Sequence, residues 1–362
     1  MNEERIPQTP PVIRPVGDEI SRPRWSVMIP AYNCFGYLET ALESVLVQDP
    51  GPDQMQIEVI DDCSTDGDLR ALVERVGRGR VSYYQQPFNR GSLRNFQTCL
   101  NRSRGELVHL LHGDDAVLPG FYRRIDTLFN RHPKIGAAFT NHSVINRYGK
   151  EIYGRPPLME GAGVIQDWLS KIARRQRLQP PAMVVKRQVY EHLGGFFAFH
   201  FGEDWEMWVR IAAHYPVAYA PERLALYRYH SNNITTRSFL SGQNIQDIYK
   251  AIDTIQHYLP PEKQKTYRRL ARRYKSIYIA QKSHQLYNEE ATPAAAIYQA
   301  REAFRMSKNP NTLYIVFKLY LKKLIRYKSL KMTIQKKLAW KNRETSKRNA
   351  DRSMPGWPDP TT

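Results

Sequence analysis

Two adjacent aspartates, Asp114 and Asp115, directly follow the apolar run LVHLL and a His-Gly dipeptide. Like charges at the end of a buried strand repel each other, so a positively charged partner is expected beside them. A divalent cation such as Mg²⁺ or Mn²⁺ suits paired carboxylates, and such cations are commonly shared with substrate phosphates. Aspartate also favours solvated turns, where it forms local hydrogen bonds. The pair therefore predicts either half of a cation site or a turn.

A second acidic pair, Glu203 and Asp204, opens the segment EDWEMWVRIAAHY, which has the apolar spacing of a helix. A carboxylate there could act as a general base if it faces a substrate hydroxyl. The same position also suits a plain helix cap, because the helix dipole stabilises negative charge at its N-terminus. The position at a helix start, taken alone, favours a capping role for this carboxylate. A catalytic role is favoured only when the flanking segments are taken into account.

Short apolar segments alternate with helical patterns along the first two thirds of the chain. We expect strands at 25–29, 57–60, 81–84, 107–111, 135–140 and 182–185, and two more in VAYA and LALYRY. Strands and helices in this alternation predict an α/β fold, with a largely parallel sheet covered by helices on both faces. Ligands of such sheets bind beyond the carboxyl ends of the strands.

The loops after four of these strands are rich in Asp, Asn, Arg and Gly. They cover residues 30–33, 61–64, 89–94 and 113–115. Because the carboxyl ends of parallel strands share one edge of a sheet, we expect these four loops to converge on one cleft. His109 and His112 flank the aspartates, and their alternation along the strand favours structural roles.

The order of these motifs resembles that of the family 2 glycosyltransferases, inverting enzymes built on the GT-A nucleotide-sugar fold. The resemblance covers about 24–240, and five segments carry it: SVMIPAYNCFGYLETALESVLVQ, IEVIDDCSTDG, NRGSLRNFQTCLNRSRGELVHLLHGDD, MVVKRQVYEHLGGFFAFHFGEDWEMWVRIA and LYRYHSNNIT. It implies a GT-A domain, transfer of a sugar from a nucleoside diphosphate donor, and dependence on Mn²⁺ or Mg²⁺. One departure is Gly113, where the family usually has an acidic or small polar residue.

The resemblance also implies roles for single residues of the donor site. A nucleobase and ribose pocket is expected from the first loop, and diphosphate or sugar contacts from the helix after the third. Asp62 would accept a hydrogen bond from the base, whereas Asp61 is equally consistent with a turn cap. The residues expected to contact the donor are Pro30, Ala31, Tyr32, Asn33, Asp62, Arg94, Asn95 and Asp114.

The resemblance further implies the metal ligands and the catalytic base. Asp115 would bind the metal, Asp114 would lie between ribose and metal, and His230 would join the metal or contact the diphosphate. His230 is equally consistent with a polar residue that ends a strand. Asp204 is the expected catalytic base, because inverting transfer requires a carboxylate on the acceptor side, with Glu203 as the other candidate.

These observations predict a metal-dependent inverting glycosyltransferase with a UDP-sugar favoured as donor. The acceptor would be a hydroxyl of a glycan or a lipid-linked molecule in the synthesis of cell-surface polysaccharide or glycoconjugate. The alternative is a non-catalytic protein of the same fold that binds a membrane or another anionic surface through its basic tail. The presence of Asp62, Asp115 and Asp204 together favours the enzyme.

Charge is concentrated near the C-terminus. The net charge is +19, and residues 301–350 hold fifteen Lys and Arg against Glu302 and Glu344. Within 310–345 an apolar stripe lies beside a basic one, as expected for a helix on an anionic membrane surface or for a helix packed on the catalytic domain. Nucleic acid is disfavoured, because no recognised binding module accompanies the charge.

We expect four regions along the chain: a flexible, proline-rich lead at 1–23, a catalytic domain at 24–240, a helical basic region at 241–345 and a flexible tail at 346–362. Three widely spaced cysteines indicate neither a disulfide framework nor a zinc site. The sequence contains no apolar run long enough to span a bilayer, and its start is unlike a signal peptide. We therefore expect a cytoplasmic protein, peripheral on the inner face of the plasma membrane.

Overall fold

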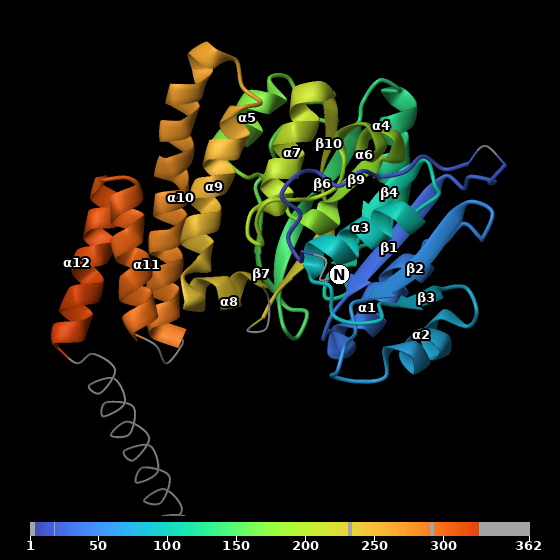
Figure 1. Ribbon diagram of the computed structural model, residues 1–362, viewed down its shortest axis with the longest axis horizontal. Coiled ribbons are helices and arrows are strands. Elements are labelled where there is room, and N and C mark those ends of the chain that lie inside the picture. Colours follow the sequence, from blue (N-terminus) through green and yellow to red (C-terminus); the bar gives the residue numbers. More distant parts are fainter. Residues whose placement is uncertain (1–3, 18, 231–233, 290–292, 326–362) are drawn as a thin grey trace, which may run out of the picture. The chain divides into compact units, whose positions relative to one another are not determined.

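The computed structural model describes residues 4–17, 19–230, 234–289 and 293–325 (Figure 1). The chain forms two compact units, Met1–Lys275 and Ser276–Thr362. The first unit contains a ten-stranded sheet, and the described part of the second is helical. The domain limits expected near residues 24, 240 and 345 remain predictions.

The sheet has the strand order β3-β2-β1-β4-β9-β6-β10-β5, with β7 paired to β6 and β8 paired to β10. Strands β3, β2, β1 and β4 are mutually parallel, and β10 is parallel to β6. Strand β9 is antiparallel to both of its neighbours. The sheet is therefore mixed and mostly parallel, as expected. The strands are β1 Trp25–Ala31, β2 Met55–Asp61, β3 Ser82–Gln85, β4 Leu107–Leu110, β5 Ala116–Val117, β6 Ala137–Asn146, β7 Glu151–Gly154, β8 Gly163–Val164, β9 Met183–Lys186 and β10 Val217–Tyr229.

Strand β10 differs from its expected form. The segments VAYA and LALYRY form one strand rather than two, because the pairing with β6 shifts register between Ala220 and Ala225 without ending. Such a bulge places extra residues in one strand and interrupts the apolar alternation. Three strands were not expected: β5 and β8 have two residues each, and β7 is exposed along most of its length.

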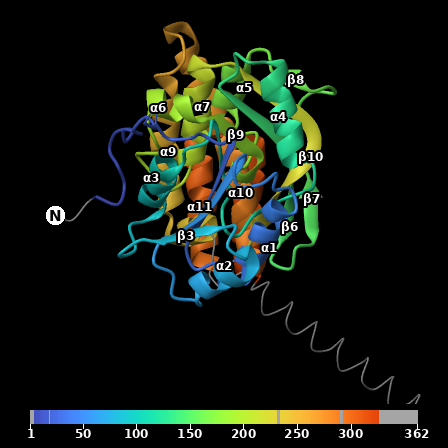
Figure 2. The ribbon, with the colours of Figure 1, turned by 90° about the vertical axis from the view of Figure 1, so that its right-hand side faces the viewer.

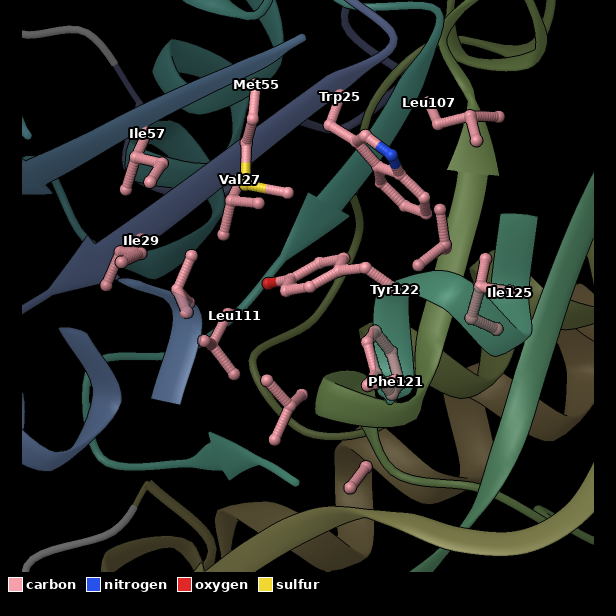
Figure 3. Close-up of a cluster of buried hydrophobic side chains, with 14 of the residues drawn as sticks. Trp25, Val27, Ile29, Met55, Ile57, Leu107, Leu111, Phe121, Tyr122 and Ile125 are labelled. Atoms are coloured by element: carbon pink, nitrogen blue, oxygen red, sulfur yellow. The ribbon is translucent and has the colours of Figure 1, made fainter. Parts of the chain in front are cut away.

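Helices cover both faces of the sheet (Figure 2). Helices α1, α2 and α4 share one apolar cluster with Trp25, Val27 and Ile29 of β1, while α3 contacts β1, β2 and β4 outside that cluster. In this cluster the Tyr122 ring packs edge-on against Trp25 at 5.1 Å (Figure 3). The helices are α1 Phe35–Leu46, α2 Leu69–Gly77, α3 Ser92–Arg102, α4 Phe121–Arg131, α5 Trp168–Arg174, α6 Arg187–Leu193, α7 Glu203–His214, α8 Ile234–Ser241, α9 Gln243–Gln256, α10 Pro261–Glu289, α11 Pro293–Met306 and α12 Pro310–Leu324.

The proline-rich N-terminal segment packs on the first unit instead of forming the flexible lead that the sequence predicts. Ile13 is 1% exposed, and the carbonyls of Pro7 and Pro11 accept hydrogen bonds from the amides of Ala198 and Gly195, each at 2.8 Å. Proline lacks an amide hydrogen but keeps its carbonyl, so an extended proline-rich segment can still bond to a neighbouring loop. The composition of the segment did not reveal this partner.

The second unit contains the end of α10, α11 and α12, packed through a small cluster that includes Leu286, Tyr287, Ala296 and Leu319. The helical C-terminal region is therefore confirmed as far as residue 325, while the rest of the basic segment and the expected tail at 346–362 lie outside the described residues. In the part of the chain that the structure describes, every helix is too short or too polar to cross a membrane.

Candidate active site

The loop that carries the aspartate pair is held under the end of β1. The amide of Gly113 donates to the carbonyl of Pro30 at 3.1 Å. Asp115 is 1% exposed, and its Oδ1 accepts a hydrogen bond from the amide of Arg228 at 2.8 Å, while its Oδ2 has no partner in the described part of the chain. Burial and the neighbouring Asp114 raise the pKa of Asp115 well above its usual value. A cation would relieve both the burial and the repulsion.

Asp114 and His112 complete this acidic cluster. One ligand atom from each of His112, Asp114 and Asp115 lies within 4.8 Å of the others, a spacing that fits one metal ion. Burial alone would raise the pKa of Asp114, but a hydrogen bond from His230 and the nearby His112 ring lower it instead. The alternation along the strand predicts a structural role for His112, but the strand ends at Leu110. The turn that follows brings His112 to the aspartates.

The end of β10 fixes this loop from the other side. Nε2 of His230 lies 3.0 Å from Oδ2 of Asp114, and Nε of Arg228 donates to the carbonyl of Asp114 at 2.8 Å. The Tyr37 ring packs against both side chains, 4.9 Å from the Arg228 guanidinium and 4.8 Å from the His230 ring. His230 therefore lies at the aspartate pair as predicted, and its role as a metal ligand remains a prediction.

Gly113 has a packing reason for being glycine. A Cβ at this position would lie 2.7 Å from Sγ of Cys34 and 3.5 Å from Cβ of Ala31. Position 113 is thus glycine, and not the usual acidic or small polar residue of the family, because the buried Cys34 fills the space that a side chain there would need.

The first two loops are tied together by side-chain hydrogen bonds. The amide of Asn33 donates to Oγ of Ser64 at 2.9 Å, and Oδ1 of Asn33 accepts from the amide of Thr65 at 2.8 Å. Asn33 has a φ of 51°, a left-handed conformation that asparagine tolerates better than most residues. Tyr32 is 42% exposed, so its ring is available to a ligand. Pro30 and Ala31 are buried beneath it.

The two aspartates that end β2 hold loops. Asp61 accepts hydrogen bonds from Ser64 and from the Tyr83 hydroxyl, which is the turn-capping alternative left open above. Asp62 is 2% exposed and accepts from Nδ2 of Asn89 and from the amides of Arg90 and Gly91, at 2.7–3.0 Å. It therefore binds the third loop to the second. Its predicted contact with a nucleobase remains a prediction.

Arg94 and Asn95 at the start of α3 point to different partners. Arg94 donates from Nε to the carbonyl of Glu4, at 2.8 Å, and from Nη1 to Gln97. Asn95 is 2% exposed, and its amide group bonds to the carbonyl of Ile60 and to Gln86. The predicted contact between Asn95 and the diphosphate or sugar is therefore not available in this conformation, because α3 turns the side chain inward.

The acidic pair of α7 lies in a polar cluster that the motifs did not reveal. Oδ2 of Asp204 accepts a hydrogen bond from Nε2 of Gln176 at 2.7 Å, and Nζ of Lys275 donates to Oε1 of the same glutamine at 3.2 Å. Lys275 is 3% exposed, and its Nζ lies 4.4 Å from the centre of the Trp205 ring. Gln176 follows α5 and Lys275 belongs to α10, so only the tertiary fold brings them to Asp204.

Burial and charge shift the titration of this cluster. Burial raises the pKa of Asp204 to about 6, against the lowering effects of Lys275 and of the hydrogen bonds. Burial and the adjacent Asp204 raise the pKa of Glu203 well above its usual value. Burial lowers the pKa of Lys275 to about 8. A carboxyl that titrates near neutrality suits a general base, because it is ionised at working pH and still binds a proton readily.

Aromatic side chains join the two acidic sites. The His112 ring stacks on Phe96 at 5.2 Å, Phe96 contacts Phe196 at 5.3 Å, and Phe196 contacts Trp208 of α7 at 6.2 Å. The aspartate loop and α7 are thus parts of one packed arrangement rather than separate surface features.

Comparison with known proteins agrees with this arrangement. Residues 26–192 match the model of glycosyl transferase family 2. An uncharacterised protein of Mycobacterium tuberculosis is 28% identical over 239 residues, which are 63% of this chain and 74% of the relative. An uncharacterised glycosyltransferase of Mycoplasma pneumoniae is 31% identical over 118 residues, but these cover only 32% of this chain and 39% of the relative.

Two solved structures share the fold. TarS of S. aureus, in a crystal structure of residues 1–349 with UDP-GlcNAc, aligns with a TM-score of 0.58 and 14% identity over 78% of this chain and 81% of TarS. A mannosyltransferase of Pyrobaculum calidifontis, in complex with GDP-Man and Mn²⁺, aligns with a TM-score of 0.54 and 21% identity over 87% of this chain and 90% of that enzyme. At these identities the likeness shows the fold alone. The match over 26–192 indicates a family 2 glycosyltransferase domain in this chain, and the solved structures show that the chain has the GT-A fold of such enzymes.

Proposed function

We propose that the chain transfers one sugar, with inversion, from a nucleoside diphosphate sugar to a hydroxyl of a glycan or lipid-linked acceptor, in the presence of Mn²⁺ or Mg²⁺. A UDP-sugar is the favoured donor, and synthesis of cell-surface polysaccharide or glycoconjugate is the favoured role. The domain that matches family 2 supports glycosyl transfer. The donor, the metal and the acceptor are the parts of the proposal that need experiment.

The observation that carries the metal-dependent reaction is the buried Oδ2 of Asp115, which lacks a partner in the described part of the chain. An unsatisfied buried acceptor costs about 1–3 kcal/mol, and more when it is charged. His112, Asp114 and Asp115 would hold the cation, whose bound form would neutralise charge on the departing diphosphate. Oxygen-rich ligand sets suit Mg²⁺ and Mn²⁺.

The chain's own residues would supply the remaining steps. Tyr32, which is exposed above the first loop, would contact the nucleobase. Asp204 would accept the proton of the acceptor hydroxyl while the oxygen attacks the anomeric carbon. The hydrogen bond from the Gln176 side chain fixes the orientation of the Asp204 carboxylate, whereas the hydrogen bonds to the Glu203 carboxylate come from the adjacent backbone at Gly202 and Glu203. This difference supports Asp204 over Glu203 as the base.

Release of UDP or GDP from a panel of donors, with Mn²⁺ and with EDTA, tests the proposal. We expect Asp115→Asn to lose Mn²⁺-dependent turnover and Asp204→Asn to bind donor but release no nucleotide. The matched control is Asp126→Asn. Asp126 lies in α4 and forms an ion pair with Arg24, so this variant should release nucleotide as the parent does. If no donor is turned over and Asp115→Ala binds nucleotide as tightly as the parent, the protein is a non-catalytic binding protein instead.

We further propose peripheral attachment to an anionic membrane through the second unit. Helix α12 exposes Leu313 by 53%, Phe317 by 64% and Leu324 by 80%, and carries Lys318 and Lys323. Exposed apolar residues beside lysines favour an anionic membrane surface. Flotation with anionic and neutral vesicles tests this: deletion of 310–362 should weaken binding to the anionic vesicles at least tenfold and leave binding to the neutral vesicles unchanged. Unchanged flotation would contradict the attachment.

A further inference from the structure

A cavity of about 310 Å³ lies beside α5, between that helix, the preceding loop and Tyr267 of α10. Leu158, Ile165 and Trp168 give it an apolar side, and Lys171, Arg174 and Arg177 give it a cationic one. The volume is at the lower end of the range for small-molecule sites, about 300–1,000 Å³. It is therefore large enough for a small anionic group such as a phosphate with one attached sugar.

The cations of this pocket have few anionic partners. Arg174 and Arg177 make no hydrogen bond or ion pair with the other described residues, and Nε of Arg177 is buried without a partner there. Asp167 is the one carboxylate among the described residues that line the cavity, and Lys171 donates to the carbonyl of Gln166 at 2.8 Å. The pocket thus has a net positive charge that the described residues around it do not neutralise.

Neighbouring arginines increase this imbalance. Burial is the largest effect that lowers the pKa of the Arg177 guanidinium, and Arg175, Arg174 and Arg155 lower it further. Arg175 stacks on the Tyr274 ring at 4.6 Å. Gathering like charges without carboxylates destabilises a fold. Such a cluster is expected where an anionic ligand supplies the missing charge.

The pocket is connected to the proposed base through α5 and the loop that follows this helix. Arg177 directly follows Gln176, whose side chain donates to Asp204 at 2.7 Å. Helix α5 packs against α7, and Nε1 of Trp205 donates to the carbonyl of Ile172 at 2.7 Å (Figure 1). A ligand held by Arg174 and Arg177 would therefore contact the end of α5, the helix that packs on α7, and the loop that carries Gln176.

We propose that Lys171, Arg174 and Arg177 bind a phosphate group of the acceptor, so that the acceptor is a phosphorylated glycan or lipid-linked sugar. This rests on the proposed function, because it assigns the acceptor side of the same reaction. Arginine suits the task, since its planar donors match phosphate oxygens two at a time. The apolar side of the pocket would contact the sugar ring or the carbon chain next to the phosphate.

The direct test measures binding by the full chain of a water-soluble hexose 1-phosphate and of phosphatidylglycerol vesicles, in EDTA and without donor. The double variant Arg174→Gln/Arg177→Gln is compared with Arg123→Gln, an exposed arginine of α4. We expect the double variant to bind either the hexose 1-phosphate or the vesicles at least tenfold more weakly than the parent does. Weaker binding of the hexose 1-phosphate indicates a soluble phosphate, and weaker binding of the vesicles indicates a lipid-borne phosphate. Equal binding by both variants in both arms would overturn the proposal, as would no binding by the parent.

A stability measurement separates recognition from a structural role. Because the charges repel one another, the double variant should melt at a higher temperature than the parent without ligand. A lower melting temperature would mean that the arginines support the fold, and would overturn the proposal. Nucleotide release by the parent is scored separately: its absence would refute the transfer reaction while leaving a measured phosphate site standing.

Discussion

Replacement of Lys275 by Met is expected to move the pH dependence of sugar transfer to higher pH. Lys275 is buried and linked to Asp204 through Gln176, so its charge favours the ionised form of the base. Burial raises the pKa of Asp204 to about 6 in spite of that charge. Without Lys275 only the hydrogen bonds oppose burial, and Glu203 still repels ionisation.

The expected size of the shift follows from the geometry. An opposite charge within about 4–6 Å lowers a carboxyl pKa by about 1–3 units. Lys275 acts across one glutamine rather than by direct contact, so we take the low end and expect Asp204 to titrate about one unit higher. At pH 6 the ionised fraction of the base would then fall about fivefold, whereas at pH 8 it would change by about a tenth.

The assay is the pH profile of kcat/KM for transfer, from pH 5 to 9, with Lys275→Arg as the matched control. The control keeps the charge and should keep the acid limb within a few tenths of a unit. If Lys275 had only a structural role, Lys275→Met would lower kcat/KM by the same factor at every pH. An unmoved acid limb in Lys275→Met would refute the coupling of Lys275 to Asp204, and with it this identification of the base.

Three further outcomes test the construction of the site. Gly113→Ala should lower the melting temperature, because its Cβ would lie 2.7 Å from Sγ of Cys34, and Cys34→Ala in the same chain should restore most of the loss. Asp115→Asn should raise the melting temperature of the metal-free protein, since it replaces a carboxyl whose ionisation is opposed by burial and by Asp114, and should abolish stabilisation by Mn²⁺ in a thermal shift titration. Deletion of residues 1–16 should reduce the free energy of unfolding by at least about 2 kcal/mol through the loss of the Ile13 contact, and an unchanged denaturation midpoint would contradict the packing described here.

Local rules explain why the sequence could place the aspartate pair just after the end of a buried strand. A buried strand ends at Leu110, and parallel strands bring their carboxyl ends to one edge, so the pair had to face the ligand side of the sheet. The two-strand interpretation of VAYA and LALYRY failed because a bulge breaks alternation without ending the strand. Proline-rich composition suggested flexibility at the N-terminus, although a packed extended segment has the same composition.

Local sequence patterns could not predict the surroundings of Lys275 and Asn95, because tertiary packing determines them. Lys275 belongs to a helix with many basic residues, and no local signal separates it from its exposed neighbours. Asn95 stands in a motif of the donor site, yet the turn of α3 buries it. In both cases the decisive quantity is burial, which depends on elements far away in the sequence.

Two charged side chains of opposite sign, Asp115 and Arg177, lie apart in the first unit. Asp115 has a buried oxygen and Arg177 a buried Nε that lack a partner among the described residues, although the two groups could neutralise each other if the fold brought them together. Instead, Asp115 follows β4 and Arg177 follows α5. A fold selected only for stability would pair or remove such charges, because leaving them costs free energy. Their separation is consistent with the two proposals, in which a ligand of opposite charge completes each site: a cation and a diphosphate at the aspartates, and a phosphorylated acceptor at the arginines.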